Sequence, residues 1–183
     1  MFPKNKIAIV LKYPYFRASI FYMNFTIRKA TENDVPAMLQ LVKELAEFER
    51  EPEAVINTET MMREDGFGEQ SIYRAFVAEN QNEIVGIALY YTAYSTWKGK
   101  IVYLDDIVVT EKQRRSGIGK KLIDAVLKEA NLCGANQIRW QVLEWNTSAI
   151  EFYKTLGVEF DPQWINCRMS KEQIQNYVDS ARF

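Results

Sequence analysis

A short segment between a predicted strand and a predicted helix has the composition of an anion-binding turn. Two glycines there would let the backbone turn tightly, so that several N–H groups point outward beside the start of the helix. Such groups can hold a phosphate or a pyrophosphate. A plain strand-to-helix turn with solvated arginines fits these residues equally well. The segment consists of Arg114, Arg115, Ser116, Gly117, Ile118 and Gly119.

Two common phosphate-binding motifs do not fit this turn. The dinucleotide fingerprint requires a third glycine, and a Walker loop requires Ser or Thr after Gly119-Lys120, where the chain has Lys121. The predicted site is therefore a pyrophosphate turn of another kind.

The composition limits the chemistry available elsewhere in the chain. There is no histidine, which excludes a histidine triad, a histidine base and most zinc sites, so proton transfer needs Asp, Glu, Tyr, Lys, Cys or water. The formal charge of −1 is unfavourable for binding nucleic acid. Cys133 and Cys167 are far apart and outside metal-ligand spacing, which is typical of buried, reduced thiols in a cytoplasmic protein. We expect no metal site.

The hydrophobic pattern from Phe25 onward predicts alternating strands and helices. Thr31 and Asp34 form a capping-box-like start for a helix that continues to about Glu49. The order β-α-α-β-β-β-α-β-α-β-α indicates an α/β protein with a mixed sheet covered by helices on both faces. The predicted strands cover residues 25–29, 73–79, 84–92, 100–109, 137–142 and 165–169, and the later helices 58–66, 117–133, 147–156 and a short one opened by Ser170.

The first 22 residues differ from the rest because they carry basic residues, no acidic residue and only one short apolar run, residues 7–11. Five residues cannot span a bilayer, so we expect no membrane insertion. We interpret residues 1–22 as an extension outside the fold and residues 23–183 as a single domain, since the chain has enough apolar material for one core.

The motif R-x-x-G-x-G, followed by a second strand-to-helix unit with Asn146 and Tyr153, resembles the GNAT superfamily of N-acetyltransferases. Further runs resemble its diamine acetyltransferase family, which acts on spermidine, spermine or thialysine. The run STWKG favours the thialysine branch, because the polyamine branch tends to have an acidic residue in place of Ser95. These runs are KELAEFE (43–49), EDGFGE (64–69), YSTWKGK (94–100), YLDDIVV (103–109), EWN (144–146) and FYKTLG (152–157).

The resemblance implies an acetyl-CoA-dependent enzyme that acetylates a small amine by direct attack, without a metal, as a cytoplasmic homodimer with a mostly antiparallel mixed sheet. It implies that Tyr153 is the general acid and that Asp105 contacts the amine. The residues that it places on the coenzyme are Ile107, Val108, Val109, Arg114, Arg115, Ser116, Gly117, Ile118, Gly119, Lys120, Asn146, Ser148 and Tyr153.

The neighbours Asp105 and Asp106 leave one question open. An alkyl ammonium must lose a proton before it can attack a thioester, and a nearby carboxylate can take that proton, directly or through water. Adjacent side chains on a strand point to opposite faces, so only one aspartate faces the cleft unless a bulge intervenes. Asp106 is the alternative proton acceptor, or a residue that only pairs locally.

The resemblance also places Phe48 and Glu49 in contact with the substrate, with Trp97 and Glu144 as further candidates. Trp97 could equally be a core or interface aromatic, and Asn146 a plain helix cap. Two other functions stay open: acetylation of a protein or peptide amine, and a non-catalytic sensor that binds acyl-CoA.

Overall fold

The computed structural model describes residues 25–181, which form two compact units that divide between Trp140 and Gln141. The predicted extension, residues 1–22, lies outside the described residues.

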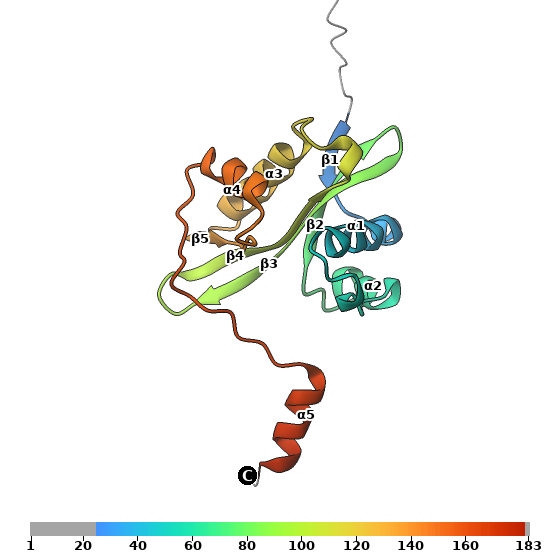
Figure 1. Cartoon of the computed structure of the whole chain (residues 1–183). Helices are drawn as coiled ribbons and strands as arrows, with labels where there is room; N and C mark the ends of the chain where they lie inside the picture. Colours follow the sequence, from blue (N-terminus) through green and yellow to red (C-terminus); the bar gives the residue numbers. More distant parts are fainter. Residues whose placement is uncertain (1–24, 182–183) are drawn as a thin grey trace, which may run out of the picture. The chain divides into compact units, whose positions relative to one another are not determined.

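The first unit is built on a five-stranded sheet in the order β1-β2-β3-β4-β5 (Figure 1). The first four strands are antiparallel neighbours, and only β4 and β5 run parallel. This confirms the predicted mixed, mostly antiparallel sheet. The strands are β1 (Phe25–Lys29), β2 (Arg74–Asn80), β3 (Glu83–Ser95), β4 (Gly99–Val109) and β5 (Gln137–Arg139).

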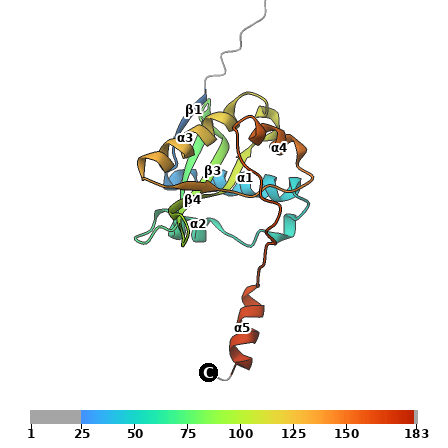
Figure 2. The same cartoon turned by 90° about the vertical axis from the view of Figure 1, so that its left-hand side faces the viewer.

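Helices cover both faces of this sheet, as predicted (Figures 1 and 2). On one face, α1 (Val35–Phe48) and α2 (Glu59–Phe67) bury a core cluster with β2, β3 and β4 that includes Met38, Met62 and Ile87. On the other face lies α3 (Ile118–Leu132), whose apolar side follows helical spacing. Short 3₁₀ turns precede α1, α2 and α3: η1 (Glu32–Asp34), η2 (Pro52–Ala54) and η3 (Glu111–Gln113).

Gly86 lets the start of α3 approach the sheet closely. A Cβ at this position would lie 2.9 Å from the carbonyl oxygen of Val108 and 3.2 Å from Cδ1 of Leu122. Because the Val108 carbonyl is part of the backbone, it cannot move aside as a side chain can, and a larger residue at position 86 would push β3 away from β4 near the start of α3. Gly86 therefore helps to position the turn before α3.

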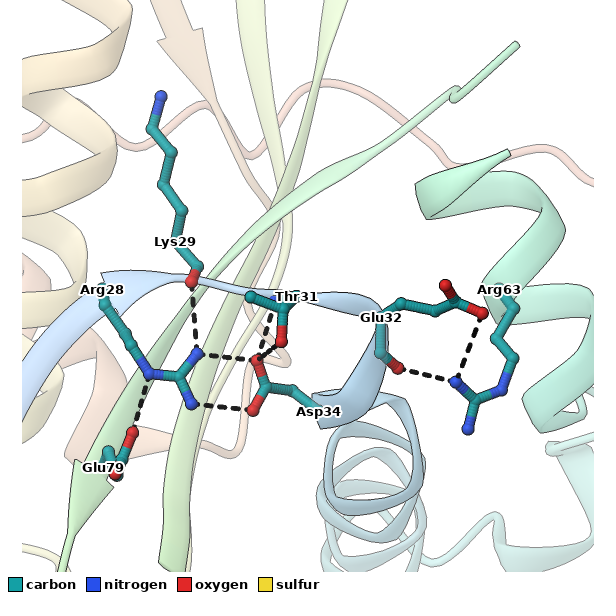
Figure 3. Close-up of polar contacts among 7 residues, drawn as sticks. All are labelled: Arg28, Lys29, Thr31, Glu32, Asp34, Arg63 and Glu79. Atoms are coloured by element: carbon teal, nitrogen blue, oxygen red, sulfur yellow. Dashed lines mark hydrogen bonds and ion pairs between the residues drawn. The ribbon is translucent and has the colours of Figure 1, made fainter. Parts of the chain in front are cut away.

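A cluster of ion pairs and hydrogen bonds links β1 to the start of α1 (Figure 3). The Arg28 guanidinium donates to both carboxylate oxygens of Asp34, at 2.7 and 2.8 Å, and to Glu79 at 2.7 Å. The Asp34 carboxylate also accepts from the N–H and hydroxyl of Thr31, which confirms the predicted cap. Asp34 is buried, and Arg28 lowers its pKa to about 2.

The second unit contains α4 (Thr147–Lys154) and α5 (Lys171–Ser180). Ser170 caps α5, as expected, because its hydroxyl accepts from the N–H of Gln173 at 3.1 Å. The predicted strand 165–169 is wrong: these residues are irregular and exposed. A strand requires backbone partners, and among the described residues none pairs with this segment.

Two smaller expectations also need correction. The strand predicted at 137–142 is only three residues long, since β5 ends at Arg139. Cys167 is exposed and Cys133 only partly buried, although both were expected to be buried; both are free thiols. Within residues 25–181, no helix has the length and apolarity needed to cross a membrane.

Candidate active site

A β-bulge changes the direction of the two neighbouring aspartates. Leu89 pairs with Asp106 but Tyr90 pairs with Leu104, so Asp105 is the extra residue of β4. Leu89 packs against the core cluster under α1, and Val108, two residues beyond Asp106, belongs to that cluster. Asp106 therefore lies on the α1 face, whereas Leu104 is buried on the opposite face. In a regular strand these two residues would lie on the same face, so it is the bulge that brings Asp106 to the α1 face.

The bulge brings together three carboxylates. Burial, together with the nearby charges of Asp105 and Glu49, raises the pKa of Asp106 to about 6. Burial also raises the pKa values of Asp105 and Glu49. Glu49 directly follows α1, so two segments distant in sequence supply the cluster. A carboxylate with a pKa near 6 is still mostly ionised at neutral pH and accepts a proton more readily than an ordinary aspartate.

One edge of β4 is open beside this cluster. β5 pairs with β4 only from Ile101 to Tyr103, whereas residues 107–109 pair with β3 on the other side. Within the sheet that the structure describes, no strand covers the edge beyond Tyr103. Backbone groups of residues 107–109 that point away from β3 could therefore pair with an elongated ligand that carries amide groups, in the manner of an added strand.

The turn between β4 and α3 has the shape expected of an anion site. Arg115 and Gly117 have φ of 62° and 86°, and Gly117 precedes the first residue of α3. The N–H of Lys121 donates to Gly117, so the N–H groups of residues 118–120 lie at the start of the helix, where no side-chain hydrogen bond caps it. The first turn carries Lys120 and no acidic residue, which suits a negatively charged ligand.

Arg114 connects this turn with the end of α1. Its guanidinium lies 5.0 Å from the ring centroid of Phe48, and its Nε donates to the carbonyl of Val109 at 3.0 Å. Phe48 is the neighbour of Glu49, so the predicted substrate contacts and the predicted phosphate turn lie on connected elements. A stacked guanidinium is a cation–π contact.

The remaining candidates lie apart from this cluster or in the second unit. Trp97, at the tip of the β3–β4 hairpin, is 81% exposed, which excludes the core interpretation. Along β4 the tip is on the order of 20 Å from Asp105. In the second unit, Asn146 caps α4 by accepting from the N–H of Ala149 at 3.1 Å. Ser148 and Glu144 are exposed, while Tyr153 is buried with its ring 5.4 Å from that of Phe152.

Sequence reasoning missed an aromatic pair beside the carboxylates. Tyr91 and Tyr103 pair across β3 and β4, and their rings stack at 5.3 Å with an interplanar angle of 23°. Burial, together with the nearby charge of Asp105, raises the pKa values of both phenols. Each tyrosine looks like an ordinary strand residue in sequence, and only the strand register shows that they meet.

Residues 36–158 match the acetyltransferase (GNAT) family. The chain belongs to this family. The matched range includes the carboxylate cluster, the open edge, the turn before α3 and Tyr153. As a GNAT protein it is an acyltransferase of the N-acetyltransferase class.

Curated relatives support the same assignment. Thialysine N-epsilon-acetyltransferase from Bos taurus is 43% identical over 141 residues, which cover 73% of this chain and 83% of the relative. The protein of that name from Caenorhabditis elegans is 31% identical over 85% of this chain and 98% of its own length. The spermidine/spermine N(1)-acetyltransferase-like protein 1 from Homo sapiens is 31% identical, over 82% of this chain and 23% of its own length.

Solved structures support the fold. An integron cassette protein from Vibrio cholerae superposes with a TM-score of 0.71 at 19% identity, over 86% of this chain and 99% of that one. An aminoglycoside acetyltransferase from an uncultured soil metagenomic sample gives 0.67 at 24% identity, over 80% and 95%. These neighbours confirm the GNAT fold and, at such low identity, nothing about the acceptor.

Proposed function

We propose that this protein transfers the acetyl group of acetyl-CoA to a primary amine of a small diamine, polyamine or lysine-like acceptor by direct attack. The observation that carries the proposal is the carboxylate cluster on the α1 face beside the open edge of β4, with Asp106 at a pKa of about 6. A cationic amine held there would lie next to both a counter-charge and a proton acceptor.

Two parts of the first unit fit the coenzyme. The uncapped start of α3 and the turn from Arg114 to Lys120 suit the pyrophosphate, and a Cβ at Gly117 would meet nothing within 4 Å, so the surface there is open. The edge at Ile107, Val108 and Val109 suits the amide groups of the pantetheine arm. The coenzyme supplies an activated acetyl thioester. In the second unit, Asn146 and Ser148 are further proposed contacts.

The carboxylates remove the proton from the acceptor. Asp106 accepts it directly, or through a water molecule shared with Asp105, because its raised pKa is closest to neutral. Glu49 and Asp105 supply negative charge that helps to bind the cationic acceptor. An N–H on the open edge of β4 donates to the carbonyl oxygen that becomes negative during attack. This assigns the base role to Asp106 and a binding role to Asp105.

Tyr153 completes the reaction as the proton donor to the departing thiolate, since a phenol is protonated at neutral pH. Tyr153→Phe should lower kcat about tenfold to 10⁴-fold with little change in the affinity for acetyl-CoA. The matched control is Tyr94→Phe, which alters a tyrosine that is 78% exposed on β3. An unchanged kcat in the Tyr153 variant would remove its role as the acid.

The acceptor class rests on the charge of the site and on the names of the relatives. Three carboxylates suit an acceptor with more than one cationic group, and the relatives named above act, by name, on thialysine or belong to the spermidine/spermine type. A peptide amine is the competing acceptor and would need no second cation.

We also propose that the two units act as one domain in a cytoplasmic homodimer. The family match runs from 36 to 158 and so includes residues of both units. Free thiols suit a reducing compartment. Exposed apolar side chains in the second unit, among them Trp164 at 73% and Ile165 at 88%, are a surface that a second copy could cover. Sedimentation of the full chain would test the dimer.

The deciding experiment is a CoA-release assay with spermidine, putrescine, thialysine, lysine and a peptide amine, together with calorimetric titration of acetyl-CoA. We expect tight coenzyme binding and turnover with one of the small amines. Binding without any CoA release would favour the sensor, turnover only with the peptide would favour the protein acceptor, and the absence of binding would refute the proposal.

A further inference from the structure

The stacked pair Tyr91 and Tyr103 is placed where an acceptor would lie. Tyr91 is two residues from Leu89 on β3, and Leu89 packs against the core cluster under α1, so Tyr91 shares that face. Tyr103 is its cross-strand partner, and both rings are partly exposed. The pair therefore lies on the same side of the sheet as Asp106.

Asp105 connects the pair with the carboxylate cluster. Asp105 is the neighbour of Asp106 in the bulge and is two residues from Tyr103, and its charge acts on both phenols and on Asp106, so it is near the aromatic pair and near the residue assigned as the base. Because Asp105 is the extra residue of the bulge, its side chain has no cross-strand neighbour of its own and is more exposed than Asp106. A negative charge beside the face of an aromatic ring is a favourable environment for an ammonium group.

We propose that Tyr91, Tyr103 and Asp105 form a subsite for a second cationic group of the acceptor, while the reacting amine lies at Asp106 and Glu49. This inference rests on the proposed function and adds the origin of its selectivity. The alkyl chain between the two cations lies along the rings, where apolar contact replaces water. An acceptor with two cations is therefore bound at both ends, and a simple alkylamine at only one.

The test compares putrescine with butylamine, which have the same carbon chain and differ by the second amine. At saturating acetyl-CoA, the ratio of their kcat/KM values measures the contribution of the subsite. Tyr91→Leu and Tyr103→Leu should each reduce this ratio about threefold to thirtyfold. The loss should appear as a higher KM for putrescine, because each substitution removes one aromatic ring that contacts the second cation. Asp105→Asn should reduce the ratio at least as much.

Two further variants separate recognition from packing. Tyr103→Phe keeps the ring and should keep the ratio, while a purely structural role would lower the activity with both amines alike. Tyr94→Leu, at an exposed tyrosine of β3, the strand that also carries Tyr91, is the matched control and should leave both rates unchanged.

Several results would overturn the subsite. One is an unchanged ratio in both leucine variants, and another is an equal loss with the two amines. If the leucine variants melt well below the parent, Asp105→Asn decides alone, and an unchanged ratio there refutes the subsite. Failure of the proposed function looks different, since the parent protein would then release no CoA with either amine.

Discussion

Two aspartates in the first unit show how the surroundings of a carboxylate decide its use. Asp34, at the start of α1, is held by Arg28 and Thr31, and its pKa falls to about 2. Asp106, in the bulged part of β4, has a pKa that burial and the nearby charges of Asp105 and Glu49 raise to about 6. The residue type is the same and both side chains lose water contact, so the sign of the neighbouring charges separates them.

The comparison indicates opposite effects on folding. The ionised form of Asp34 is favoured in the folded state, so it stabilises β1 and α1. The ionised form of Asp106 is disfavoured in the folded state, so it opposes folding at neutral pH and is kept ready to take up a proton. A stabilising carboxylate and a reactive one thus need different environments.

Replacing Asp106 tests most directly whether this carboxylate is the reactive one. Asp106→Asn removes the proton acceptor and should lower kcat/KM for the best amine by about 10²- to 10⁴-fold. Glu83→Gln, at an exposed carboxylate in the first residue of β3, is the control and should retain full activity. If instead Asp105→Asn abolishes turnover while Asp106→Asn retains it, the roles of the two neighbours are exchanged.

The pH profile of the parent enzyme gives a second measure. The base works only when deprotonated, so kcat/KM should fall about tenfold for each pH unit below the pKa of Asp106, about 6. This limb should disappear in Asp106→Asn, as measured with a buffer series and the same amine. A limb near pH 4 would contradict the raised pKa.

Replacing Asp34 should affect stability and leave the catalytic groups in place. Asp34→Asn leaves Arg28 without its principal partner and should lower the free energy of unfolding by about 2 kcal/mol, because the Asp34 carboxylate is buried, although the Arg28 side chain is 34% exposed. Glu32→Gln, at the more exposed ion pair with Arg63 in Figure 3, is the control and should cost under about 0.5 kcal/mol.

The contribution of Asp34 to the free energy of unfolding should decrease as the pH falls. Since the folded pKa of about 2 lies below the ordinary 3.8, the contribution of Asp34 is complete above about pH 4 and is lost as the pH falls toward 2. Urea titrations from pH 7 to pH 2 should therefore converge for the parent and Asp34→Asn. Parallel curves over this range would show that the ion pair does not stabilise the fold.

The smallest expected effect is a gain in stability when Asp106 is replaced. Removing a charge that burial and two carboxylates disfavour should raise the free energy of unfolding at pH 7.5 by about 1 to 2 kcal/mol in Asp106→Asn. The gain should shrink below pH 6, where Asp106 of the parent is already protonated. A loss of stability at pH 7.5 would mean that Asp106 is held by favourable contacts, as Asp34 is.

Much of the fold could be predicted because its signals are local. Helical spacing identified α1 and α3, and Ser170 marked the start of α5. The segment 165–169 has an apolar pattern suited to a strand, but a strand also needs a partner, which local sequence cannot supply. The site was predicted only in part for the same reason, since Tyr91 and Tyr103 meet across two strands.

Local sequence was enough to identify the turn from Arg114 to Gly119, the acidic pair Asp105 and Asp106, and the resemblance to GNAT enzymes, because each depends on neighbouring residues. The tertiary structure decided which way the acidic pair points. That direction depends on one extra residue in the register between β3 and β4, and it brings Asp106 to the face where Glu49 arrives from α1. Pairing between distant strands is a property of the assembled sheet, and the pKa of Asp106 follows from it.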